Sequence, residues 1–185
     1  MSEPARKPMT SDEFIAWAMQ QPETDHYELV DGEVLAMAPE RSAHVLAKAH
    51  IWRRLAEAIE SGNLLCQAYP GGMAVEVDDR TVYEPDALVR CGASLAPDAI
   101  KLSDPVIVVE VLSPSTSAGD VGAKLVDYFR LPSLRYYLIV RAESRTIIHH
   151  QRGKDGIILT RIVREGPIEL EPPGITLTDW FPPAR

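Results

Sequence analysis

The sequence contains no apolar run close to the ~20 residues that a membrane-spanning helix needs. Its first residues, MSEPARKPMT, lack the apolar segment of a secretory signal. Only two cysteines are present, Cys66 and Cys91, far apart in the sequence and without the spacing of a metal site. This favours reduced thiols in a cytosolic protein. We therefore expect a soluble, cytoplasmic protein that does not associate with membranes.

An excess of basic residues is also missing. The chain has 19 Lys and Arg against 27 Asp and Glu, a formal net charge of −8. Phosphate binding depends on clustered Lys and Arg, so this charge argues against a broad nucleic-acid surface but allows a local patch. A long basic run and zinc-finger spacing are absent too, which makes sequence-specific recognition by this chain alone doubtful.

The length and patterning predict one domain. The chain has 185 residues, 45% of them apolar and 25% charged, as in ordinary globular proteins. We expect a flexible arm over residues 1–9 and a single domain over 10–185. Thr10 and Glu13 form a capping box that predicts a short helix. In YELVDGEVLAM, Asp31-Gly32 separates two apolar runs and predicts a hairpin.

A long helix is predicted over 42–59, ended by Gly62. The apolar stripe expected along it is Val45, Ala49, Trp52, Ala56 and Ile59. Arg41, His44 and Lys48 share a different face of the same helix. His44 and Lys48 are therefore candidates for facing a phosphate, although ordinary surface residues would have the same pattern.

The second half of the sequence predicts strands around one helix. GMAVEV and TVYEPDALVRC read as two strands, followed by PVIVVEVL, a helix over 119–131 and the strand RYYLIV. The last three form a βαβ unit. RTIIHHQ and GIILTRIV predict a further antiparallel pair. The fold class is therefore α/β, an α+β mixed sheet with helices packed on it.

One carboxylate interrupts the most apolar strand. Glu110 lies near the end of VIVVEVL, and a buried carboxylate needs a positive partner, hydrogen bonds or a metal ion. The strand EPDALV carries Asp86, which would meet Glu110 if the two strands pair. A hard divalent cation such as Mg²⁺ (or Mn²⁺) suits two carboxylates. A buried arginine or backbone donors would satisfy Glu110 equally well.

The following helix adds a cation. Asp120, Lys124 and Tyr128 are four residues apart and share one face. Lys124 can point toward Glu110, orient or deprotonate a water and offset negative charge. Two carboxylates, a divalent metal and a lysine are typical of phosphodiester hydrolysis. By itself Lys124 could be a solvated lysine, and Tyr128 and Ser113 could be structural or support the site.

The order of EPDALV, VVEVLSPST, the helix with Asp, Lys and Tyr, and the opening YELVDGEVLAMAP resembles the Uma2 (DUF820) family of the PD-(D/E)XK, restriction-endonuclease-like superfamily. The resemblance covers about 9–140. It implies an αβββαβ core, here with an N-terminal helix and hairpin and C-terminal antiparallel strands, and Mg²⁺-dependent cleavage of DNA. Asp86 matches the motif aspartate, Glu110 its acidic partner and Glu28 an early acidic position, for which Glu33 is a weaker alternative.

The sequence departs from the superfamily at the lysine. That lysine usually stands two residues after the acid, where this chain has Leu112, whereas Lys124 matches the helix position of Uma2-like sequences. Three hypotheses stay open: a metal-dependent endonuclease, a catalytically silent binding or regulatory module, and an oligomeric scaffold that pairs through GIILTRIV. The family resemblance also implies a homodimer, with nucleic acid, DNA in this family, as partner.

Overall fold

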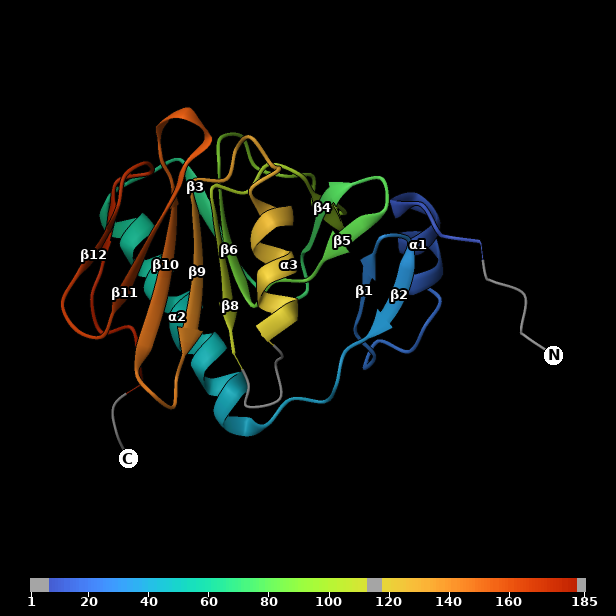
Figure 1. The fold of residues 1–185 in the computed structure, drawn as a ribbon, viewed down its shortest axis with the longest axis horizontal. Coiled ribbons are helices and arrows are strands. Elements are labelled where there is room, and N and C mark those ends of the chain that lie inside the picture. Colours follow the sequence, from blue (N-terminus) through green and yellow to red (C-terminus); the bar gives the residue numbers. More distant parts are fainter. Residues whose placement is uncertain (1–6, 113–117, 183–185) are drawn as a thin grey trace.

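The computed structural model describes residues 7–112 and 118–182, and its centre is a six-stranded sheet (Figure 1). The strand order is β11-β10-β9-β8-β6-β3. The bounds are β3 Cys66–Pro70, β6 Ala87–Cys91, β8 Ile107–Val111, β9 Tyr136–Arg141, β10 Thr146–Arg152 and β11 Ile158–Val163. β8 and β9 are parallel and are joined through helix α3, Ala118–Tyr128. The predicted βαβ unit and the antiparallel pair β10–β11 are confirmed.

A smaller sheet packs beside the first. Its order is β2-β1-β5-β4-β7, with β1 Tyr27–Val30, β2 Glu33–Ala36, β4 Ala74–Asp78, β5 Thr81–Tyr83 and β7 Lys101–Leu102. β12 Ile168–Leu170 and β13 Ile175–Leu177 form a third, two-stranded sheet. The fold class is confirmed, but the strands are divided among three sheets. TVYEPDALVRC is not one strand, because the chain leaves the smaller sheet after Tyr83 and enters the larger one at Ala87.

Two layers cover the six-stranded sheet. Helix α2, Ser42–Ser61, and the β12–β13 pair pack on one face, and α3 and the smaller sheet pack on the other (Figure 1). The buried positions of α2 are Ala47, Ile51, Leu55 and Ile59. Of the predicted stripe, Ile59 is buried and Trp52 packs against the core partly buried, but Ala49 is exposed and Val45 is 47% exposed, so the stripe is misplaced.

The predicted N-terminal helix and hairpin are confirmed. Helix α1, Ser11–Ala18, starts at the capping box of Thr10 and Glu13. Asp31 and Gly32 take φ values of 52° and 85° in the β1–β2 turn, which suits a type I′ hairpin. Met9, the last residue of the predicted flexible arm, donates its backbone N–H to the Gly32 carbonyl and packs against the small core under α1.

The prediction of two separate, reduced cysteines is wrong. Cys66 and Cys91 are directly opposite each other where β3 pairs with β6, and their sulfurs form a disulfide. Antiparallel pairing brings together residues that are 25 positions apart in sequence.

Over residues 7–112 and 118–182, no helix is long and apolar enough to cross a membrane. β11 forms one edge of the larger sheet and exposes Ile158, Leu159 and Ile162. Pairing of copies through this edge stays a prediction, as does the homodimer that the family resemblance implies.

Candidate active site

The ends of β6 and β8 bring two carboxylates together. Ala87 pairs with Val109, so Asp86, just before β6, lies at the end of β8 that carries Glu110. Asp86 is 5% exposed and Glu110 9%. Asp86 Oδ2 accepts a 2.6 Å hydrogen bond from the Val111 N–H, which fixes the aspartate to the neighbouring strand. The expected meeting of these strands is confirmed.

Lys124 reaches the carboxylates from α3. Its Nζ donates to Glu110 Oε1 at 3.1 Å and to Glu28 Oε1 at 2.7 Å. One helical turn later, the buried Tyr128 hydroxyl donates to Glu110 Oε1 at 3.1 Å. The shared helix face predicted for Lys124 and Tyr128 therefore points at Glu110.

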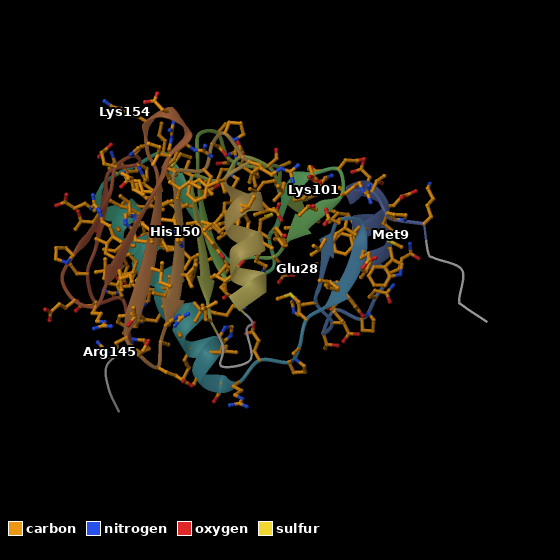
Figure 2. All side chains as sticks on the ribbon, viewed as in Figure 1. Met9, Glu28, Lys101, Arg145, His150 and Lys154 are labelled. Atoms are coloured by element: carbon orange, nitrogen blue, oxygen red, sulfur yellow. A yellow bond between two sulfur atoms is a disulfide. The ribbon has the colours of Figure 1, made fainter. Side chains whose placement is uncertain are left out.

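Glu28 enters the cluster from the smaller sheet. It lies on β1 and faces α3 (Figure 2). Its Oε1 also accepts a 3.1 Å hydrogen bond from the Glu84 N–H, in the segment where the chain passes between the sheets. The Tyr83 ring lies below the lysine, with its centroid 5.0 Å from Lys124 Nζ. The cluster thus forms at the junction of the two sheets.

Helix α2 supplies a second basic group. Lys48 Nζ is 2.9 Å from Asp86 Oδ1 and 2.6 Å from Glu40 Oε1. His44 Nε2 is 2.5 Å from the Val111 carbonyl oxygen and 3.9 Å from Asp86 Oδ2. The sequence patterns did not single out Glu40. Its spacing of four residues to His44 and eight to Lys48 was the available signal, hidden because Glu40 precedes the predicted helix.

Burial and charge shift the protonation of the cluster. Burial raises the pKa of Glu110 to about 7; Lys124 opposes this shift, and the negative charges of Asp86 and Glu28 add to it. Burial alone would lower the pKa of Lys124, but Glu110 and Glu28 outweigh it and hold that pKa above its ordinary value. Asp86 and Glu40 likewise overcome burial and raise the pKa of Lys48. Both lysines are therefore charged and already neutralise part of the acidic cluster.

Some predicted residues do not join this cluster. Ser113 lies outside the described residues, and Asp120 belongs to α3 but its side chain is outside the described part. Glu33 is exposed on β2. His149 and His150 stack on Tyr136 and Tyr137 respectively, so these neighbouring histidines point to opposite faces of the sheet.

The donor set can be compared with what a metal ion needs. Among the described side chains, no three or more His, Cys, Asp or Glu are grouped to hold a metal. Mg²⁺ is usually held by one or two carboxylates and completes its octahedron with water and substrate oxygens. Asp86 and Glu110 provide two such carboxylates, and their neighbouring lysines show that this position favours positive charge. The residues present therefore fit a hard divalent cation.

The chain resembles known proteins along most of its length. It is 28% identical to the uncharacterized protein slr1290 of Synechocystis over 149 residues, 80% of this chain and 76% of that protein. A second Synechocystis protein, the uncharacterized sll1609, is 23% identical over 163 residues, 86% of this chain and 90% of that one.

A solved structure shares the fold. It is titled "a putative nuclease belonging to DUF820" from Anabaena variabilis and matches with a TM-score of 0.71 and 14% identity, over 89% of this chain and 90% of that one. The Uma2 family model, described as "Putative restriction endonuclease", matches residues 11–181. The chain therefore belongs to the Uma2 family, within the restriction-endonuclease-like superfamily.

Proposed function

We propose that this protein is a Mg²⁺-dependent (or Mn²⁺-dependent) endonuclease that hydrolyses phosphodiester bonds of DNA. The observation that carries the proposal is the convergence of Asp86, Glu110 and Lys124 at the end of β8. Two carboxylates and one partly buried ammonium supply both a cation site and a positive group for a negatively charged substrate. Membership of a family described as "Putative restriction endonuclease" supports the same chemistry.

Asp86 and Glu110 would hold the metal. When bound, the metal supplies a water of lowered pKa and neutralises charge on the phosphate. Lys124 offsets the negative charge that develops on the phosphate oxygens. Glu28 fixes the position of the Lys124 ammonium through its 2.7 Å contact, and Tyr128 orients Glu110 by donating to Oε1.

Lys124, on helix α3, can replace the lysine that the superfamily usually has at the position of Leu112. Lys124 Nζ lies 3.1 Å from Glu110 although the two residues come from different elements. An ammonium at that distance can perform the task that the superfamily gives to a strand lysine. The missing strand lysine is therefore compatible with an active site.

Cleavage of a supercoiled plasmid and of a labelled single-stranded oligonucleotide, with Mg²⁺, Mn²⁺ or EDTA, tests the proposal. We expect metal-dependent cleavage that Asp86→Asn and Glu110→Gln each abolish. Glu57→Gln, which changes an acid on α2 paired with Arg54, is the matched control and should cleave normally. DNA binding without cleavage under every metal condition would support the silent binding module and contradict the enzyme.

A further inference from the structure

Lys48 has two carboxylate partners with different tasks. It lies 2.9 Å from Asp86, which we place at the metal, and 2.6 Å from Glu40, which we do not. Glu40 belongs to the segment before α2. The ammonium therefore contacts the acidic site and a second carboxylate at the same time.

The two oxygens of Asp86 differ in their availability. Oδ2 accepts the 2.6 Å hydrogen bond from the Val111 N–H, so it is engaged by the β8 backbone. Oδ1 is the oxygen that Lys48 contacts. A divalent cation that binds Oδ1 would meet the positive charge of Lys48 within a few ångströms, and like charges at that distance repel strongly.

The surroundings of Lys48 differ from those of Lys124 in the exposure of the carboxylate partners. A Cβ at Gly71 would lie only 3.3 Å from Lys48 Nζ, so the glycine keeps a side chain away from the ammonium. The side chain of Glu40 is 29% exposed, whereas the side chains of Glu28 and Glu110, the partners of Lys124, are only 10% and 12% exposed. One carboxylate partner of Lys48 is therefore accessible to solvent, whereas both partners of Lys124 are largely buried.

The geometry points to Lys48 as an exchangeable counter-ion of the metal site. It neutralises Asp86 when no divalent cation is bound and withdraws to Glu40 when one binds. This inference rests on the proposed metal dependence. It adds a regulation of metal binding, because Glu40 determines how easily the Lys48 ammonium leaves Asp86. Lys48 and Glu40 are accordingly positioning residues, and they must act on metal affinity in opposite directions.

Calorimetric titration with Mn²⁺ in the absence of nucleic acid tests this. Lys48→Met removes the competing charge and should tighten the Mn²⁺ Kd about tenfold, a usual size for coupling between two sites. Glu40→Gln leaves Lys48 with Asp86 alone and should weaken it. A merely structural ion pair would give both variants the same sign. Lys101→Met, which removes a lysine bridging Asp12 and Glu76, should leave the Kd unchanged.

The failures can be told apart. An unchanged Kd in Lys48→Met and Glu40→Gln, with binding lost in Asp86→Asn, would overturn the exchange and leave the metal site standing. Mn²⁺ binding by Lys48→Met but not by the wild type would support the exchange in a stronger form. No binding by the wild type or by Lys48→Met would remove the metal dependence itself, and the exchange with it.

Discussion

The two larger sheets contribute unequally to the site and to the core. The six-stranded sheet supplies Asp86 and Glu110 and is packed on both faces. The five-stranded sheet supplies Glu28, and its outer face is covered by the eight-residue α1, which packs Phe14 against Leu29 and Val82. The acids that would hold the metal thus come from the better buried sheet. The third acid, Glu28, comes from the smaller sheet, and Lys124 links the two sheets by contacting both Glu28 and Glu110.

Loss of Lys124 should have the largest effect, because it leaves Glu28 and Glu110 close together without their shared cation. Breaking a buried ion pair by removing one partner typically costs about 3–5 kcal/mol. We expect Lys124→Met to lose that much free energy of unfolding in urea at pH 8. Lys101→Met, in a more exposed pair on the smaller sheet, should lose less than about 1 kcal/mol. Equal losses of unfolding free energy in the two variants would contradict the idea that Lys124 links the two sheets.

Removing the disulfide should affect the stability of the six-stranded sheet, because both cysteines lie on its strands. Cys66–Cys91 joins the edge strand β3 to β6 and closes a loop over a sequence separation of 25. A loop of that length is expected to add about 3 kcal/mol by restricting the unfolded chain. The double variant Cys66→Ser/Cys91→Ser should lose that stability, and a reducing agent should lower the wild-type melting temperature but not that of the variant. A reductant-insensitive wild type would show that the bond does not form.

The pH dependence of stability isolates Glu110. Its pKa is raised from 4.5 to about 7 in the folded state by burial first and by Asp86 and Glu28 next, against the opposing Lys124. Between those two values the folded chain binds more protons than the unfolded chain, so this group makes stability fall as pH rises from 4.5 to 7. Relative to Glu110→Gln, the wild type should therefore lose unfolding free energy across that window and stay level above it. A wild type that gains unfolding free energy relative to Glu110→Gln as pH rises through this window would contradict the assignment.

Local signals in the sequence predicted most of what these experiments address. The capping box at Thr10, the Asp31-Gly32 turn and the apolar β8 depend on neighbours in the chain, and each is found in the structure. Asp86 and Glu110 were brought together by assuming that two strands pair. The proximity of the two carboxylates could be predicted because the pairing of two strands fixes which of their residues lie opposite each other.

The remaining features depend on contacts that no local pattern contains. The disulfide needs the register of β3 against β6. The buried face of α2 was misplaced because Val45 and Ala49 repeat at the same interval as Ala47 and Ile51, and only the sheet decides which stripe it covers. Glu40 lies outside a regular element and joins the site through its contacts with Lys48 and His44.

The smallest effect should come from the far end of the smaller sheet. Thr10 Oγ1 accepts from the Glu13 N–H at 3.2 Å, and the Thr10 N–H donates to Glu13 Oε2 at 2.9 Å. Thr10→Ala removes one of these bonds at the start of α1 and should cost about 1 kcal/mol, as lost N-caps usually do. Because α1 packs on the five-stranded sheet and not on the site, hydrogen exchange should speed up at Phe14 and Leu29 and stay unchanged at Val109. Faster exchange at Val109 as well would mean that the two sheets unfold together, and the unequal division between them would apply to the site but not to stability.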